Sequence, residues 1–94
     1  MRAVKVQGNN AKHRVLMYAI STCGWCKKAK RTLNELDVAY EYIDVDLLDD
    51  EEKQVIMKDI LDRGGRLVYP TLIIDGATLL AGPSRSKLVE VLEL

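Results

Sequence analysis

The stretch from Val15 to Val45 restricts the fold of this chain more than any other. Val15 to Ile20 is a compact apolar run, too short for a helix and typical of a buried central strand. Between Cys23 and Leu36 the apolar residues recur at helical spacing, and a second β-prone segment, Val38 to Val45, follows. A strand, a helix and a strand within about 30 residues predict a βαβ unit with parallel strands and a right-handed crossover.

The next part of the chain predicts a second helix and a hairpin. Residues 49–52 are all acidic, which favours a helix N-terminus, and Gly64-Gly65 is a suitable place for that helix to end. Thr71 to Ile74 and Thr78 to Leu80 are β-prone segments. Asp75-Gly76 stands between them and is a strong signal for a two-residue hairpin turn.

The two ends of the chain complete the predicted organisation. Ser84 suits a helix N-cap, and Lys87 to Leu94 has the apolar spacing of a final helix. Ala3 to Val6 can form a short strand. We expect residues 1–12 to be an N-terminal extension to the domain, which can be flexible. Residues 13–94 then form one domain in the order β-α-β-α-β-β-α. We predict an α/β fold with a central four-stranded mixed sheet flanked by helices.

Composition and charge exclude several classes of function. The 14 basic and 14 acidic residues cancel, so no net field attracts the chain to nucleic acid or to a membrane. No apolar run approaches the roughly 20 residues that span a bilayer. The N-terminal residues lack the apolar centre of a secretory signal. We therefore expect a cytoplasmic monomer with no nucleic-acid or membrane partner.

The cysteine content indicates redox chemistry. The two cysteines of the chain stand as Cys23-Gly24-Trp25-Cys26. A secreted disulfide scaffold would carry four or more cysteines. A structural zinc site needs about four ligands, and His13 is the only other soft one, so we expect no metal and no bound cofactor. One close pair in an intracellular chain is typical of a redox centre.

The position of the pair predicts a different role for each sulfur. At the first turn of a helix, free backbone N–H groups and the helix dipole stabilise a Cys23 thiolate. We expect Lys27, Lys28 and Lys30 to add to that field, each such effect being worth about 0.3–1 kcal/mol. Cys26 lies one turn deeper on the apolar face. It is expected to remain a thiol and then to attack the mixed disulfide formed at Cys23.

Three further segments occur in an order that is known from one protein family. They are Met17 to Lys30, which contains both cysteines, Tyr42 to Asp46, and Val68 to Thr71 before the hairpin. In this order they resemble the active-site stretch, the second strand and the cis-proline loop of dithiol glutaredoxins and related redoxins of the thioredoxin superfamily. The resemblance covers about Val15 to Leu92. It implies a thioredoxin-like fold of the glutaredoxin type.

The resemblance also implies an activity and a binding groove. It implies a thiol–disulfide oxidoreductase that reduces protein or glutathione mixed disulfides, with glutathione as a possible co-substrate. It implies a cis peptide bond at Tyr69-Pro70, with both residues bordering the groove beside the cysteines. Trp25 is expected either to be exposed and contact partners or to pack against its own helix. Lys27 is a further candidate for substrate binding.

Two positions differ from the glutaredoxins that use glutathione. Ile20 stands where they carry a basic residue, and Ala81 to Arg85 lacks the acidic pair that follows their paired glycines. Ser84 and Arg85, at a helix start, are the residues expected to hold a carboxylate instead. Three alternatives therefore stay open. They are a thioredoxin-like redoxin recharged by a flavin-dependent reductase, a glutaredoxin that binds a [2Fe–2S] cluster through Cys23, and an interaction domain whose cysteines are incidental.

Overall fold

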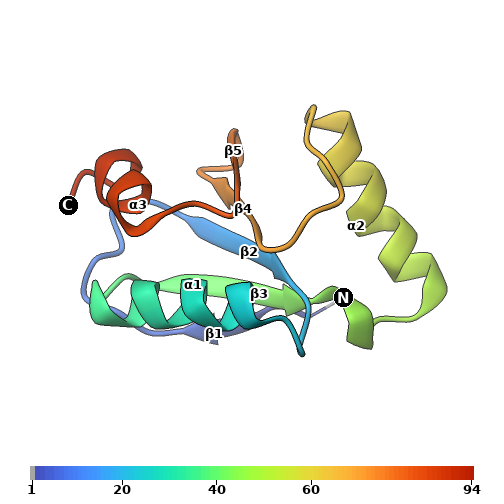
Figure 1. Ribbon diagram of the computed structural model, residues 1–94, viewed down its shortest axis with the longest axis horizontal. Helices are drawn as coiled ribbons and strands as arrows, with labels where there is room; N and C mark the ends of the chain where they lie inside the picture. Colours follow the sequence, from blue (N-terminus) through green and yellow to red (C-terminus); the bar gives the residue numbers. More distant parts are fainter. Residues whose placement is uncertain (1) are drawn as a thin grey trace.

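The chain folds around a mixed β-sheet with helices on both faces (Figure 1). The computed structural model describes residues 2–94, in which there are five strands, three α-helices and one short 3-10 helix. In chain order these are β1 (Val4–Val6), β2 (Val15–Ala19), α1 (Gly24–Glu35), β3 (Tyr40–Asp44), η1 (Val45–Leu47), α2 (Asp50–Asp62), β4 (Thr71–Ile74), β5 (Thr78–Ala81) and α3 (Arg85–Val91). No helix in this part of the chain is long and apolar enough to span a lipid bilayer.

The strand order is β1-β3-β2-β4-β5. β2 and β3 are parallel, as the predicted βαβ unit requires. β4 lies between β2 and β5 and is antiparallel to both. From β2 onward the predicted order of strands and helices is confirmed, and the architecture is the thioredoxin-like α/β fold.

The sheet has five strands where the sequence predicts four, because Val4–Val6 joins it as β1. β1 runs antiparallel to β3, with Val4 opposite Tyr42. Gly8 follows at a close approach, where a Cβ atom would lie 2.5 Å from the backbone nitrogen of Ala39. Only a glycine therefore lets the segment stay against the sheet. The β-branched valines also cover the edge that β3 would otherwise expose.

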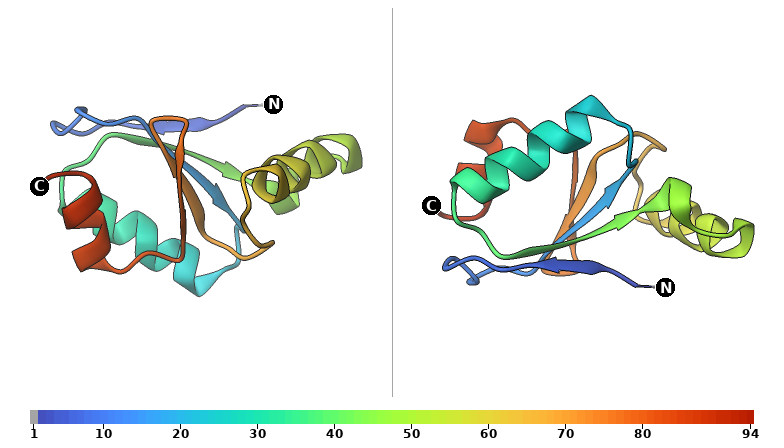
Figure 2. Two further views of the ribbon diagram at one scale, coloured as in Figure 1. Left: turned by 90° about the horizontal axis from the view of Figure 1, so that it is seen from above. Right: turned by 90° about the horizontal axis from the view of Figure 1, so that it is seen from below.

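The helices divide between the two faces of the sheet. α1 and α3 lie together on one face, and α2 packs against the other near one end of the sheet (Figures 1 and 2). Because side chains alternate along a strand, Met17 of β2 belongs to the first face and Tyr18 to the second. Leu33 of α1 and Leu88 of α3 fill the first core, and Ile60 of α2 fills the second.

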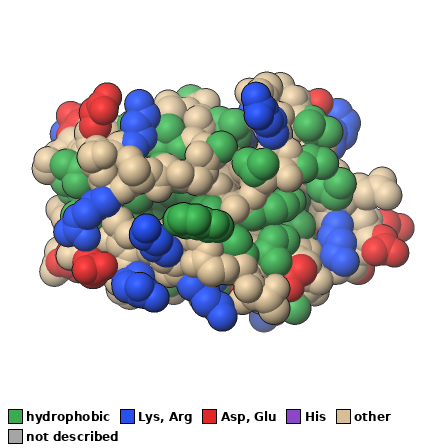
Figure 3. Space-filling model, in the orientation of Figure 1, with side chains coloured by type: hydrophobic (Ala, Val, Ile, Leu, Met, Phe, Trp, Pro, Cys, Tyr) green, Lys and Arg blue, Asp and Glu red, His purple; other side chains and the backbone are tan. Residues whose placement is uncertain are grey.

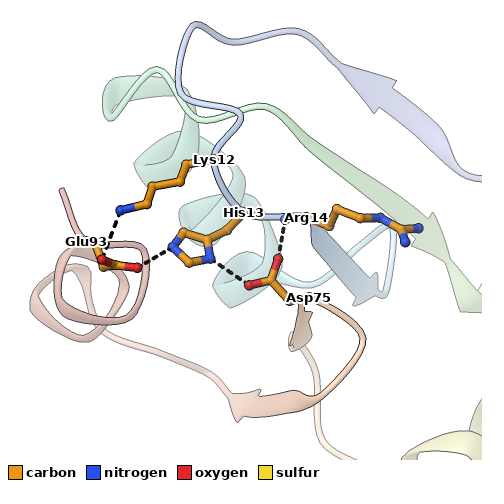
Figure 4. A network of polar contacts seen from close by, with 5 residues as sticks. All are labelled: Lys12, His13, Arg14, Asp75 and Glu93. Carbon is orange, nitrogen blue, oxygen red and sulfur yellow. Dashed lines mark hydrogen bonds and ion pairs between the residues drawn. The ribbon is translucent and has the colours of Figure 1, made fainter.

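The β4–β5 turn is hydrogen-bonded to the segment before β2 and, through His13, is connected to Glu93. Asp75 and Gly76 have φ angles of 54° and 70°, the left-handed conformation that a type I′ hairpin turn requires. The Asp75 carboxylate accepts the backbone N–H of Arg14 at 2.8 Å and lies 2.6 Å from the His13 ring. The other ring nitrogen of His13 lies 2.9 Å from Glu93, near the C-terminus (Figure 4). We call these contacts the His13 clasp.

Side-chain caps define where the second and third helices begin. The Asp49 carboxylate accepts the backbone N–H of Glu52 at 2.8 Å and caps α2. Ser84 caps α3, as its sequence position predicts. The final helix covers Arg85–Val91, so it begins and ends earlier than the Lys87 to Leu94 segment that the periodicity predicts.

Candidate active site

Cys23 lies in the connection between the carboxyl end of β2 and the first turn of α1. Its backbone is extended, with φ −80° and ψ 122°, which is the conformation of an N-cap residue. Its N–H donates to the carbonyl of Ile20 at 3.0 Å. Its Sγ accepts the backbone N–H of Cys26 at 3.3 Å. The sulfur thus takes the place of the oxygen that usually caps a helix.

Cys26 lies one turn into α1 and faces the sheet. Its side chain is 0% exposed and belongs to the core that contains Leu33. Its Sγ accepts the backbone N–H of Ile20 at 3.5 Å. Burial, reinforced by the neighbouring Cys23 sulfur, raises the pKa of the Cys26 thiol to about 11. At neutral pH this sulfur is a thiol.

The environment of Cys23 shifts the pKa of its thiol in the opposite direction, downward. The Cys26 thiol donates to the Cys23 sulfur, and the backbone N–H groups of Cys26 and Trp25 add to it, which lowers the pKa of Cys23 below its usual value. The helix start therefore favours the thiolate of the half-buried sulfur. The two thiols of the reduced pair differ in acidity as the sequence predicts.

The lysines contribute less than predicted, and the field they were expected to provide at Cys23 is not among the causes of its lowered pKa. Lys28 places its ammonium over the Trp25 ring, 5.2 Å from the centroid. Lys30 pairs with Asp44 at 3.5 Å, and its charge acts on the pKa of Cys26 instead. The ammonium groups of Lys28 and Lys30 are thus held by other side chains and do not contact the Cys23 sulfur.

The loop before β4 lies next to the Cys23 sulfur. The Tyr69-Pro70 peptide bond is cis, as the family resemblance implies. The carbonyl oxygen of Tyr69 lies 3.9 Å from the Cys23 sulfur. The loop is held on both sides of Pro70, because the Thr71 hydroxyl donates to the carbonyl of Val68 at 2.6 Å and the N–H of Gly82 donates to the carbonyl of Pro70 at 2.8 Å.

Exposed apolar side chains lie in the two segments that meet at the reactive sulfur, the start of α1 and the loop before β4. Trp25 is 70% exposed, which fits the expectation of an exposed ring, and its contact with a partner stays a prediction. Leu67 and Val68, in the loop that precedes Tyr69, are exposed as well. Figure 3 shows hydrophobic side chains gathered in the middle of the face on which α1 lies, with lysine and arginine side chains around them. This surface is suited to contact with another molecule.

The remaining predicted binding residues lie in different surroundings. Lys27 is exposed on α1, one turn after Cys23. The Ser84 hydroxyl is occupied as the cap of α3, where it accepts the N–H of Lys87 at 3.2 Å. Arg85 pairs at 3.9 Å with Glu35, at the end of α1 away from the cysteines. A helix of this length spans on the order of 18 Å, so the structure does not bring Arg85 to the sulfurs.

One polar contact beside the cysteines was not foreseen. Asp46, in η1, accepts two hydrogen bonds from Ser21, one from the backbone N–H at 2.8 Å and one from the hydroxyl at 2.5 Å. In the sequence this residue is part of an acidic stretch that resembles an ordinary solvated surface. The signal that could have found it is topological, since the parallel strands β2 and β3 end at the same edge of the sheet.

The described residues 2–94 contain no group of three or more His, Cys, Asp or Glu side chains that could hold a metal ion. Cys23 is partly exposed and Cys26 is buried. A bridging cluster on this chain would therefore have Cys23 as its sulfur ligand, and the other ligands would come from elsewhere.

Sequence comparisons identify relatives of this chain. The family model described as Glutaredoxin matches residues 15–78. "Glutaredoxin 1" of Rickettsia conorii is 38% identical over 63 residues, which are 67% of this chain and 59% of the relative. The match thus spans less than two thirds of that relative's length. A glutaredoxin-like 8.6 kDa protein of Clostridium pasteurianum is 27% identical over 84% of this chain and 97% of its own length.

Solved structures match over more of the chain. The glutaredoxin from Methanosarcina mazei Go1 has a TM-score of 0.88 and 31% identity, and the match covers 100% of this chain and 90% of that one. The methanoredoxin of Methanosarcina acetivorans has a TM-score of 0.79 and 36% identity, with 86% and 85% covered. The family model, the sequence relatives and the solved structures agree, and the chain belongs to the glutaredoxin family.

Proposed function

We propose that the protein is a dithiol oxidoreductase that reduces disulfides by exchange through Cys23 and Cys26. The observation that carries this proposal is that the surroundings of two sulfurs one helical turn apart shift their pKa values in opposite directions. The Cys23 sulfur accepts the N–H of Cys26 at 3.3 Å and has a lowered pKa. Cys26 is buried with a pKa raised to about 11. One sulfur is thereby prepared to attack, and the other is protected until it is needed.

The exchange balances in two steps. The Cys23 thiolate attacks one sulfur of the substrate disulfide, the substrate S–S bond breaks, and the leaving thiolate takes up a proton. Cys26 then loses its proton and attacks the Cys23 sulfur, which forms the Cys23–Cys26 disulfide and releases the second substrate thiol. The substrate gains two electrons and the protein loses two.

The surroundings of Cys23 support a disulfide in an extended peptide segment as the substrate. The cis-proline loop places the backbone of Tyr69 beside the sulfur, where an extended segment would pair with it. The exposed Trp25 ring offers an apolar contact next to the reacting atoms. We assign Trp25, Lys27, Tyr69 and Pro70 to this groove.

We further propose glutathione as the co-substrate that returns electrons to the oxidised pair, because glutathione is the electron donor that the family implies. A flavin-dependent reductase is the second candidate. It is favoured by the contact of Arg85, which pairs with Glu35 and so is drawn away from the site where a glutathione carboxylate would lie. Both donors belong to a reducing compartment, so we place the activity in the cytoplasm.

A trapping experiment tests the two cysteine roles. The Cys26→Ser variant should form a stable mixed disulfide with a disulfide-bearing peptide, whereas Cys23→Ser should form none. A trap that forms only in Cys23→Ser would reverse the roles, and equal activity of both variants and the native protein would refute the mechanism. Reduction of the oxidised native protein by glutathione or by a thioredoxin-type reductase, each in a separate assay, identifies the donor.

A further inference from the structure

The carboxylate of Asp46 makes two short contacts with the loop that leads into the cysteine pair. Asp46 lies in η1, directly after β3, and is half-buried. One carboxylate oxygen accepts the backbone N–H of Ser21 at 2.8 Å, and the other accepts the Ser21 hydroxyl at 2.5 Å. Ser21 is 25 residues away in sequence, so the contact joins the ends of two neighbouring strands rather than two parts of one turn.

The peptide group between Ile20 and Ser21 is bound by Asp46 on one side and by the backbone of Cys23 on the other. The N–H of Ser21 and the carbonyl of Ile20 belong to the same planar peptide unit. Asp46 fixes the N–H end, and the carbonyl end accepts the N–H of Cys23 at 3.0 Å. If this plane rotates, the N-cap conformation of Cys23 changes with it.

The other sulfur depends on the preceding peptide. The N–H of Ile20 donates to the Cys26 sulfur at 3.5 Å, and this bond favours the Cys26 thiolate. A hydrogen bond weakens when its donor turns away from the acceptor, so this contact depends on the orientation of the Ile20 N–H. The Ile20 residue thus touches the backbone of one cysteine and the sulfur of the other, and its neighbour Ser21 is the residue that Asp46 anchors.

We propose that Asp46 is a positioning residue for the redox pair, which keeps the Ile20-Ser21 peptide in the orientation that both cysteines need. This inference rests on the proposed dithiol exchange. Asp46 does not touch the sulfurs, and it acts through Ser21 and Ile20. Its loss should affect the second step most, because the Cys26 thiolate that performs this step accepts the Ile20 N–H.

The reaction with Ellman's reagent separates the two steps. Attack by Cys23 releases one thionitrobenzoate ion, and attack by Cys26 on the resulting mixed disulfide releases a second. In Asp46→Ala the second phase should be roughly five- to tenfold slower, the effect of losing about one hydrogen bond. Asp46→Asn should stay within about twofold of the native rate, because the amide can accept the Ser21 N–H and donate to the Ser21 hydroxyl.

A matched control separates positioning from general destabilisation. Asp49 is three residues further on, and its carboxylate likewise accepts a backbone N–H at 2.8 Å, but it caps α2 away from the cysteines. Asp49→Ala should lower the melting temperature and leave both phases unchanged. If Asp46→Ala does not fold, Ser21→Ala replaces it and should slow the second phase about two- to threefold.

Each outcome decides the proposal. A native second phase in Asp46→Ala, an equal slowing in Asp49→Ala, or a slowing in Asp46→Asn as large as in Asp46→Ala would overturn it. The last of these results would assign the effect to charge instead of position. Release of only one thionitrobenzoate by the native protein would instead refute the dithiol exchange itself, so the two failures are distinguishable.

Discussion

The acidity difference between the two sulfurs can be measured after one cysteine at a time is removed. In Cys23→Ser the remaining thiol is Cys26, and in Cys26→Ser it is Cys23. At pH 8 a thiol with a pKa of about 11 is ionised to about one part in a thousand, whereas an ordinary thiol with a pKa of about 8.5 is ionised to about a quarter. Because only the thiolate reacts, Cys26 should be alkylated roughly 200-fold more slowly than an ordinary thiol.

Two structural details affect the expected ratio of the alkylation rates. Burial is the first cause of the raised pKa of Cys26 and persists in Cys23→Ser, although the contributions of the Cys23 sulfur are lost. The 0% exposure of Cys26 also blocks the reagent, which slows the reaction further. In Cys26→Ser the serine hydroxyl can donate to the Cys23 sulfur in place of the thiol, so Cys23 keeps a lowered pKa.

The assay is the rate of iodoacetamide alkylation, followed by mass spectrometry between pH 6 and pH 10. Cys23 should react at least about 100-fold faster than Cys26 at pH 8, and its rate should level off at a lower pH than that of a free thiol. In urea the two variants should react alike, which controls for the reagent. Equal rates in the folded proteins, or faster reaction of Cys26, would refute the assignment of the attacking and the resolving sulfur.

The His13 clasp and the core of α1 supply two further predictions. The Asp75 carboxylate raises the pKa of His13, so the stabilisation by its imidazolium is full below about pH 6.5 and is lost as the pH rises through the raised value. Urea unfolding should therefore show His13→Gln less stable than the native protein at pH 5.5, with a smaller difference at pH 8; a difference that grows with pH would contradict this. Leu33→Ala should lower the free energy of unfolding by about 2–5 kcal/mol, because Leu33 is fully buried. A loss below about 1 kcal/mol in the same assay would mean that the α1 core collapses around the gap.

The fold could be predicted where the sequence has a clear period. β2 and α1 follow from the change in apolar spacing around Cys23, and the β4–β5 hairpin follows from Asp75-Gly76. The sequence indicates β1 less clearly, because three residues are too few to show a period. Its pairing depends on a distant partner, the free edge of β3, and on the close approach that Gly8 allows.

The site divides in the same way between local and distant information. The N-cap position of Cys23 and the burial of Cys26 depend on a few neighbouring residues, so spacing predicts them. The partners of charged side chains depend on the whole fold. Lys30 meets Asp44 of β3, and Asp46 meets the loop before α1. Neither pair has a local sequence signal, because acidic and basic residues in isolation resemble a solvated surface.

The proposed exchange also makes the thiol with a pKa of about 11 easier to ionise when it has to react. In the reduced pair the Cys23 sulfur raises the pKa of Cys26, both through its hydrogen bond and through its charge. Once Cys23 is bonded to substrate it is neutral and no longer competes for the proton of Cys26. The Ile20 N–H and the Lys30 charge, which favour the Cys26 thiolate, then act against burial alone. Formation of the mixed disulfide thus makes the second sulfur more acidic at the moment when its attack is required.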